Sequence, residues 1–465
     1  MITEFDIKIK ITDIGANGEG IGKVDGLAVF VFPGEAEDSP NKPIIGDVVL
    51  VEITKVKKNY VVAKMKRLVA PSEYRREPFC EYAGVCGGCP LQEMSYEGQI
   101  KLKDKQVRDR LIRIAGIESP KVNKIIGMED SFRYRNKAQM PVARDAVGFF
   151  KADSNEVVNC NRCLVSAKPM EAVAEALRKF IHSNNMTAYD RKTGKGLIRH
   201  LVVRAAHGTG EVMAILVING KRLPDYQKLI GMMDGAVNEL PPYGEGKKYS
   251  LESVIFNFNT KNTSEILGER CVTAAGKPTI EDTIGSMRFE ISPLSFYQVN
   301  PVQMKKLYDK VLEYSQLTGN ETVLDVYCGI GTIGLFCARA AKKVIGIESL
   351  KSAIFDANRN AAINAVTNVE YMHGQAEEIL PKLAGEGFFA DVVILDPPRA
   401  GCKPKLLEAV CKVAPKRIVY ISCNTATLAR DVKLLMEMGY RFEEAAPVDM
   451  FPWTAHVECV VLMAR

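Results

Sequence analysis

The chain has 465 residues, of which 47% are hydrophobic and 25% are charged, and its formal net charge is +6. This length exceeds what one hydrophobic core usually organises, so we expect two to four domains in a globular protein. No apolar stretch approaches the roughly 18 residues that cross a membrane, and the first residues lack the layout of an export signal. The composition therefore excludes a membrane-spanning protein and predicts a cytoplasmic one, whose mild positive charge is compatible with an anionic polymer as partner.

Residues 1–67 contain short runs of alternating apolar and polar residues, separated by Gly-rich turns such as GANGEGIGKVDG. This pattern predicts a small β-barrel of the OB-like kind. Basic side chains gather toward its end and form either a solvated strand face or a surface that contacts phosphates. These side chains are Lys55, Lys57, Lys58, Lys64, Lys66 and Arg67.

Residues 71–299 form the second predicted unit, a central α+β domain whose first half is rich in cysteine. Cys80, Cys86 and Cys89 lie close together in the sequence, and Cys160 and Cys163 form a second pair. In a chain without an export signal, such clustered thiols indicate metal ligation rather than disulfides. Four thiolates can hold zinc or an iron–sulfur cluster, and the spacing does not choose between them, although zinc is the default expectation.

Basic and aromatic residues alternate in the stretch FRYRNKAQ, residues 132–139 of the same unit. Arg133, Arg135 and Lys137 could contact phosphates, and Phe132 or Tyr134 could stack on a base. The plainer interpretation is an ordinary surface strand. Further along, residues 196–299 read as antiparallel strands with one helix between them.

From residue 300 to residue 465, apolar strands alternate with helices. This alternation predicts a parallel, doubly wound sheet with helices on both faces. Ligands bind such sheets outside the carboxyl ends of the strands. We therefore place the catalytic domain in residues 300–465 and look for its chemistry at the strand ends.

The segment TVLDVYCGIGTIG runs from a predicted strand through a glycine turn into a helix. The spacing of Gly329, Gly331 and Gly334 fits a dinucleotide-binding turn, so an NAD-dependent oxidoreductase is the natural alternative. Asp325 precedes the glycines, however, and would repel a pyrophosphate, whereas the cationic groups of S-adenosylmethionine would tolerate it. Glu348 ends the next strand, where a carboxylate accepts the ribose hydroxyls of either cofactor. The segment therefore favours S-adenosylmethionine.

Two later strands also end in reactive side chains. Asp396 is followed by two prolines, which force the chain out beyond the sheet edge and leave the carboxylate in the cleft. Cys423 ends the next strand and begins a predicted helix. Because a helix N-terminus favours a thiolate, we expect the pKa of Cys423 to be lowered.

A thiolate beside a methyl donor indicates one particular reaction. Addition of the Cys423 sulfur to C6 of uracil gives C5 the carbanion character it needs to attack a sulfonium methyl group. A base must then remove the C5 proton so that the thiol can be eliminated. The segment FPWTAHVECV offers Glu458, which we favour, and His456.

Together these residues resemble the RNA 5-methyluridine methyltransferase family, of the RumA/TrmA type. The blocks SPLSFYQVNP, VLDVYCGIGTIGL, LDPPRAGC, VYISCNTATLARD and DMFPWTAHVECV follow the order of the family, and the resemblance covers nearly the whole chain. It implies an N-terminal TRAM domain and a C-terminal Rossmann-like methyltransferase domain that uses S-adenosylmethionine. It also implies that Cys423 is the covalent nucleophile and Glu458 the base, with cofactor contacts from Gln298, Tyr327, Glu348 and Asp396.

The resemblance further implies a [4Fe-4S] cluster in the central domain, with zinc as the alternative. Its ligands would be Cys80, Cys86, Cys89 and Cys163, and Cys160 is the rival for the fourth position. The implied substrate is a flipped uridine of 23S rRNA, because the bacterial branch specific for tRNA typically lacks both the TRAM module and the cluster. Methylation of tRNA is the alternative within the family. From other classes, an NAD-dependent oxidoreductase or a non-catalytic RNA-binding protein would not need Cys423 and Glu458 together.

Overall fold

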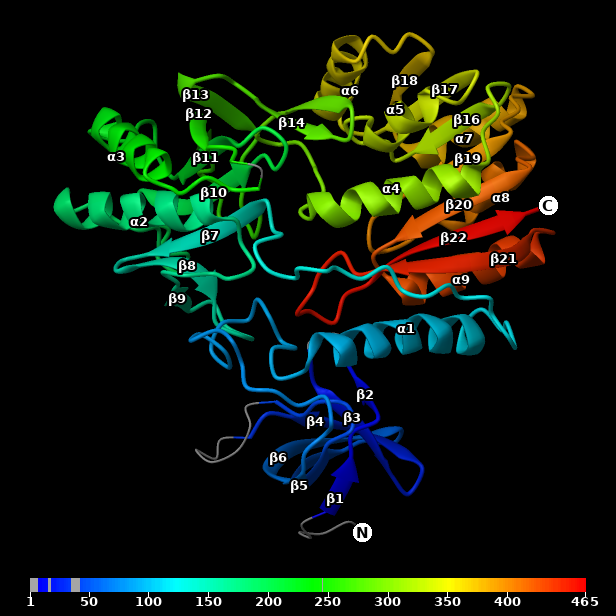
Figure 1. Ribbon diagram of the computed structural model, residues 1–465, viewed down its shortest axis with the longest axis horizontal. Helices are drawn as coiled ribbons and strands as arrows, with labels where there is room; N and C mark the ends of the chain where they lie inside the picture. The colour runs from blue at the N-terminus through cyan, green and yellow to red at the C-terminus, as the bar shows by residue number, and fades with distance from the viewer. Residues whose placement is uncertain (1–6, 16–17, 35–41, 245) are drawn as a thin grey trace.

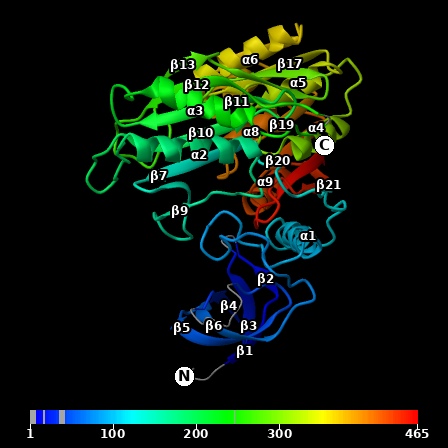
Figure 2. The same cartoon turned by 60° about the vertical axis from the view of Figure 1, so that its left-hand side comes forward.

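A computed structural model of the chain describes residues 7–15, 18–34, 42–244 and 246–465 (Figure 1). Its strands form three large sheets and a small two-stranded sheet, and a long helix lies between the first large sheet and the others (Figure 2). Residues 1–6, 16–17 and 35–41 of the predicted N-terminal module lie outside the described residues. Within the described part of the chain, no helix is long and apolar enough to cross a membrane.

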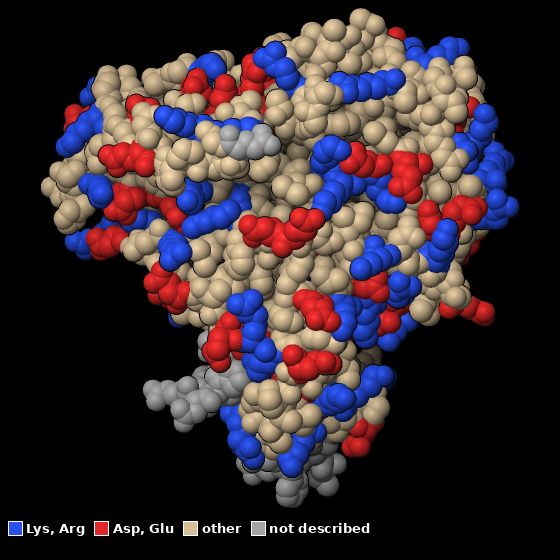
Figure 3. All heavy atoms as spheres, viewed as in Figure 1, with Lys and Arg blue, Asp and Glu red and all other residues tan. Residues whose placement is uncertain are grey.

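The N-terminal sheet has six strands in the order β1-β5-β6-β4-β3-β2. Buried and exposed side chains alternate along β6, because successive residues of a strand point to opposite faces. The six basic residues named above are all exposed. On the face of the molecule seen in Figure 3, Lys and Arg are interspersed with Asp and Glu. The strands are β1 (Ile7–Lys10), β2 (Asp13–Ile14), β3 (Gly20–Val24), β4 (Leu27–Phe32), β5 (Val48–Val56) and β6 (Tyr60–Ala70).

Helix α1 (Tyr96–Arg113) connects two hydrophobic cores. The Ser95 side chain caps its first turn by accepting a hydrogen bond from a backbone amide. Leu102 packs into the core of the N-terminal sheet, whereas Val107 packs into the core of the C-terminal sheet. Although the helix is rich in charge, Lys103 is completely buried.

The central sheet has seven strands in the order β13-β12-β11-β10-β7-β8-β9. Helices α2 and α3 pack with one face of it, and the other face shares a core with the C-terminal unit. β11 and β12 pair in parallel because α3 crosses between them, so the prediction of antiparallel strands is wrong for this pair. The elements are β7 (Lys137–Ala143), β8 (Ala146–Phe150), β9 (Val157–Asn159), α2 (Lys168–Ser183), β10 (Ile198–Ala205), β11 (Glu211–Ile218), α3 (Tyr226–Asn238), β12 (Ser250–Phe258) and β13 (Arg270–Gly276), followed by the hairpin β14 (Ile280–Ile284) and β15 (Met287–Ile291).

The C-terminal sheet has seven strands in the order β18-β17-β16-β19-β20-β22-β21. The first five are parallel and the last two antiparallel, with helices on both faces, which confirms the predicted doubly wound fold. The strand order reverses between β16 and β19, the position at which such sheets bind ligands. The elements are α4 (Pro301–Ser315), β16 (Thr322–Val326), α5 (Thr332–Ala338), β17 (Lys343–Glu348), α6 (Lys351–Ile363), β18 (Val369–His373), α7 (Ala376–Gly385), β19 (Val392–Leu395), α8 (Pro404–Lys412), β20 (Arg417–Ser422), α9 (Thr425–Glu437), β21 (Arg441–Val448) and β22 (Glu458–Ala464).

Candidate active site

Strand register sets Cys423 beside Glu458. β20 and β22 pair antiparallel, and Ser422 opposite Cys459 is the last pair of their ladder. One further step along the register sets Cys423 opposite Glu458. Asp396 directly follows β19, the neighbour of β20 on its other side. Three reactive side chains from three adjacent strands therefore meet at one edge of the sheet.

Both carboxyl groups at this edge are shielded from water. Glu458 is 5% exposed, and burial raises its pKa to about 8, assisted by the nearby charge of Asp396 and opposed by Arg399. Burial also raises the pKa of Asp396 to about 7. A carboxylate with a raised pKa is a stronger base than an ordinary glutamate, which suits the removal of a proton from carbon.

The predicted lowering of the pKa of Cys423 is wrong. Burial is the largest influence and raises the pKa of this thiol, and the charges of Glu458 and Asp396 raise it further. Arg399 opposes them by its charge and by a hydrogen bond to the sulfur. Arg399 was not predicted as a site residue, although its position directly after Asp396-Pro397-Pro398 could have indicated it.

The glycine turn after β16 lies above a buried acid. Tyr327 has φ of +67° and Gly331 has φ of +81°, in the left-handed region that favours glycine. At Gly331 a Cβ atom would lie 2.4 Å from the hydroxyl of Tyr371, so only glycine fits there. Asp325 is 1% exposed, and neither carboxylate oxygen has a hydrogen-bond partner among the described residues. Burial raises its pKa to about 8, so a cationic ligand group would relieve its isolation.

Two other predicted cofactor residues are held in place by backbone contacts. At the end of β17, the Glu348 carboxylate accepts hydrogen bonds from the amides of Gly329 at 3.2 Å and Leu350 at 2.8 Å. Gln298 is 7% exposed, and its carbonyl accepts a hydrogen bond from the Asn136 side chain at 3.1 Å. Asn136 therefore fixes the segment that enters the C-terminal unit.

The structure overturns most of the RNA contacts predicted for residues 132–137. Tyr134 is 6% exposed and donates to the carbonyl of Pro452 at 3.0 Å. Phe132 packs on Trp453, with ring centroids 5.5 Å apart. Arg133 forms an ion pair with Glu171 and donates to the carbonyl of Cys163 at 2.8 Å. The alternating basic and aromatic pattern therefore reflects internal packing, while Arg135 lines a cavity and Lys137 is largely buried, with its pKa lowered to about 7.

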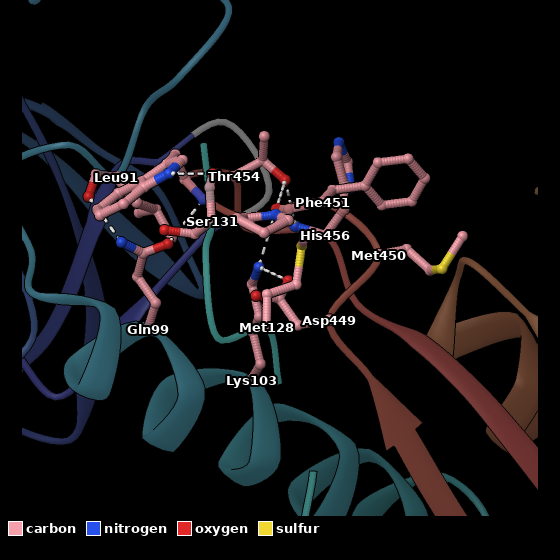
Figure 4. A network of polar contacts seen from close by, with 12 residues as sticks. Leu91, Gln99, Lys103, Met128, Ser131, Asp449, Met450, Phe451, Thr454 and His456 are labelled. Carbon is pink, nitrogen blue, oxygen red and sulfur yellow. Dashed lines mark hydrogen bonds and ion pairs between the residues drawn. The ribbon is translucent and has the colours of Figure 1, made fainter. Parts of the chain in front are cut away.

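The loop between β21 and β22 leads into Glu458 and is held by side chains of α1, which Figure 4 shows, and of α4. Lys103 forms a completely buried ion pair with Asp449 at 2.5 Å and donates to the carbonyl of Phe451 at 3.0 Å. From α4, Gln303 donates to the carbonyl of Asp449 at 3.1 Å. The path of the loop is thus fixed by residues far away in the sequence.

The same loop contains the only tryptophan of the chain, Trp453. Its indole donates to the carbonyl of Ser131 at 3.0 Å, and its amide donates to the Gln99 side chain at 2.8 Å. The residue is 1% exposed and has φ of +70°. His456, three residues later, lines a cavity together with Arg399, and burial lowers its pKa.

This cavity has a volume of about 980 Å³ and extends from the loop between β21 and β22 to the cysteines of the central unit. The thiols suit zinc or an iron–sulfur cluster as a donor set. In the described part of the chain, however, no group of three or more His, Cys, Asp or Glu side chains is arranged to hold a metal ion. The cysteines that line the cavity are Cys80, Cys86, Cys89, Cys160 and Cys163.

Two segments match known protein families. Residues 6–66 match the TRAM domain, and residues 279–465 match the family described as tRNA (Uracil-5-)-methyltransferase. An uncharacterized RNA methyltransferase of Caldanaerobacter subterraneus subsp. tengcongensis is 47% identical over 462 residues, 98% of each chain. Another, from Clostridium tetani, is 43% identical over 457 residues, which cover 97% of this chain and 95% of the relative.

One solved structure resembles the whole chain. It is the crystal structure of Pyrococcus abyssi tRNA (uracil-54, C5)-methyltransferase in complex with S-adenosyl-L-homocysteine. The similarity covers 98% of this chain and 100% of the other, with 30% sequence identity and a TM-score of 0.75. The two proteins therefore share the arrangement of all three sheets and not only the catalytic fold.

Proposed function

The chain belongs to the RNA (uracil-5-)-methyltransferase family, which uses S-adenosylmethionine, and we propose that it methylates C5 of a uridine in 23S rRNA through a covalent bond to Cys423. The observation that carries the mechanism is the register of β20 and β22, which sets a thiol opposite a buried carboxyl group. An oxidoreductase or a non-catalytic RNA-binding protein would not require this pair.

In the proposed reaction, the Cys423 thiolate adds to C6 of the uracil, and the electron pair of the C5–C6 double bond is displaced toward C5 and O4. S-adenosylmethionine supplies the methyl group that C5 takes. Glu458 then accepts the C5 proton, and the returning electron pair expels the Cys423 sulfur as thiolate. Arg399 favours the thiolate that starts the cycle by its charge and its hydrogen bond.

We propose that Gln298, Tyr327, Glu348 and Asp396 bind the cofactor. The buried, unpartnered carboxylate of Asp325 supports a cationic ligand above the glycine turn. Glu348 is held by two backbone amides at the end of β17, the position from which a carboxylate binds ribose hydroxyls.

We also propose a [4Fe-4S] cluster bound by Cys80, Cys86, Cys89 and Cys163, with zinc as the alternative. The convergence of these thiols on one cavity supports a shared ligand. The Cys160 thiol donates to the carbonyl of Arg162 at 3.5 Å and is more buried than Cys163, which supports Cys163 as the fourth ligand. The cluster has no step in methyl transfer, so we assign it a structural role.

The N-terminal TRAM domain supports an RNA substrate, and the choice of rRNA follows from the family resemblance. A transfer RNA is the second candidate, because the similar Pyrococcus abyssi enzyme is a tRNA (uracil-54, C5)-methyltransferase. In either molecule the uracil must leave its stack to reach Cys423, so we expect a flipped nucleotide in a loop.

A turnover assay with methyl-labelled S-adenosylmethionine on unmodified total RNA tests the proposal. We expect label in 23S rRNA, recovered as 5-methyluridine. Label in tRNA alone would support the proposed reaction and contradict rRNA as the substrate. No label in any RNA, from a folded protein with its cysteine site filled, would contradict the proposed function.

A further inference from the structure

A second cavity, of about 1050 Å³, lies in the central unit and has no part in the proposed reaction. Its walls come from the turn between β7 and β8, from the segment after α2, and from the segment after β12. It contains none of the proposed catalytic, cofactor or cysteine residues. The cavity lies at one end of β10, and Asn136 contacts the backbone at the other end of this strand. The two ends are about 20 Å apart at the usual rise of a strand.

Three buried polar atoms around this cavity lack a hydrogen-bond partner among the described residues. They are Nε of Arg199, Nδ1 of His200 and Oγ1 of Thr263. Buried polar atoms are nearly always paired in folded proteins, and leaving one unpaired costs about 1–3 kcal/mol. Three such atoms around one cavity therefore indicate a ligand that supplies the missing partners.

Arg199 is fixed in its position and only 3% exposed. One of its terminal nitrogens donates to the carbonyls of Asn259 at 2.8 Å and Lys261 at 2.7 Å. Its guanidinium lies over the ring of Tyr189, 4.3 Å from the centroid. Tyr189 is only half-buried, so the face of its ring away from Arg199 provides a platform for a nucleobase.

The rim of the cavity adds charge. Arg144, Arg191 and Lys192 are exposed there, beside three carboxylates. Of these carboxylates, Asp190 already accepts from the amide of Lys192 at 2.8 Å and from the hydroxyl of Thr193 at 3.2 Å. Three exposed cations around a fixed arginine are suited to phosphate groups, although Arg191 also donates to the carbonyl of Thr263 at 3.4 Å. The other two carboxylates are Asp145 and Glu265.

The second cavity adjoins the first, which is lined by Arg399 and His456. Phe150, at the end of β8, lines both, so the β8–β9 hairpin forms the wall between them. This hairpin lies at the edge of the central sheet that faces the N-terminal unit (Figure 1). Arg399 contacts Cys423, so a polymer that occupies the first cavity beside Cys423 can pass over the hairpin to the second.

We propose that the second cavity binds one nucleotide of the substrate RNA, apart from the methylated uridine. The inference rests on the proposed function, which supplies RNA as the substrate. Arg191 and Lys192 bind the phosphate, the Arg199–Tyr189 pair stacks on the base, and His200 and Thr263 bind its polar edge. The cavity thus selects RNA that presents an unpaired nucleotide at a fixed separation from the target.

Photocrosslinking of the full-length protein to 4-thiouridine-substituted rRNA locates this nucleotide. We expect crosslinked peptides containing Tyr189 or Thr263, in addition to peptides from the catalytic cavity. The double variant Arg191→Glu/Lys192→Glu should lose the crosslinks to Tyr189 and Thr263 and keep the crosslinks to the first cavity. The matched control, Lys412→Glu/Lys433→Glu, reverses two exposed charges on α8 and α9 and should keep both. Crosslinks confined to the catalytic cavity would overturn the inference.

Kinetics give a second readout. The double variant should raise the KM for rRNA about tenfold with kcat unchanged, and should reduce the salt dependence of binding. Thr263→Val keeps the shape of the side chain, so it should raise KM by about threefold without changing the salt dependence. An unchanged KM in both variants would contradict a role in RNA binding. If excess uridine 5′-monophosphate removed the crosslinks without affecting the KM for RNA, the cavity would be a site for free nucleotides instead.

These outcomes are distinct from failure of the proposed function. Crosslinks in the second cavity without any methyl transfer would contradict the proposed methyltransferase activity but support RNA binding in this cavity. Methyl transfer with unaltered kinetics in the cavity variants would support the proposed activity but contradict the second binding site.

Discussion

The edge of the C-terminal sheet that carries Cys423 and the loop between β21 and β22 form one candidate site, yet different interactions hold them in place. At the edge, strand register alone sets Cys423 beside Glu458. In the loop, side chains from α1 and α4 hold the backbone by a buried ion pair and hydrogen bonds. The residues at strand ends can therefore be predicted from the sequence. The path of the loop, in contrast, depends on contacts between residues more than 100 positions apart.

Replacing the nucleophile should give the largest effect and should leave the sheet intact. Cys423→Ala removes the only sulfur at this strand end, so we expect turnover to fall by more than about 1000-fold and the covalent RNA adduct to disappear. Denaturing gel electrophoresis of labelled RNA detects the adduct. Cys402→Ala, at a buried thiol on the other side of the Asp-Pro-Pro turn, is the matched control and should keep the adduct.

Glu458→Gln should separate the two halves of the reaction. Cys423 can still add to the base and methylation can proceed, but the C5 proton has no acceptor, so the adduct accumulates. We expect turnover to fall by about 100- to 10,000-fold. The measurement is the fraction of enzyme bound to RNA after one methyl transfer. Loss of the adduct together with turnover would contradict the role of Glu458 as the base.

Lys103→Met tests the loop rather than the edge. It leaves Asp449 buried without its cation, so we expect the free energy of unfolding to fall by about 3–5 kcal/mol. Urea denaturation of the variant measures this change. The control is Lys101→Met on the same helix, where the ion pair with Glu97 is exposed, and the stability should hardly change. The double variant Lys103→Met/Asp449→Asn should recover part of the loss.

The smallest effect concerns pH. Glu458 must be ionised to accept a proton, and its pKa is raised to about 8. The pKa of Cys423 is raised as well, so both groups become protonated, and therefore inactive, as the pH falls. The rate should therefore rise more than tenfold per pH unit below about 8, where both groups are protonated. Above about 8 it should keep rising as the Cys423 thiol ionises. Arg399→Gln removes a group that lowers both pKa values, so its profile should shift to higher pH. A bell-shaped or flat profile in the wild type would contradict this assignment.

Sequence reasoning succeeded where local pattern decides structure. Alternating strands and helices predicted the doubly wound sheet, and they placed Glu348, Asp396 and Cys423 at strand ends, where the structure has them; the roles of these residues stay a prediction. It failed for Phe132 and Tyr134, because a basic and aromatic pattern is the same on a surface and in a packed core. It also missed Lys103, since nothing in a charged helix marks one lysine as buried. The pKa of Cys423 was misjudged because burial and the two carboxyl groups act on the thiol only after folding.

Trp453 has a spectroscopic consequence. As the only tryptophan, it dominates the fluorescence of the protein, and its indole is buried against Phe79 and Phe132. Cys89 and Cys163 pack in the same cluster of side chains. Emission from this single fluorophore therefore reports on the catalytic loop, and an iron–sulfur cluster at these thiols would quench it by energy transfer. Loading of the cysteine site and movement of the loop can thus be followed in the native chain without an added label.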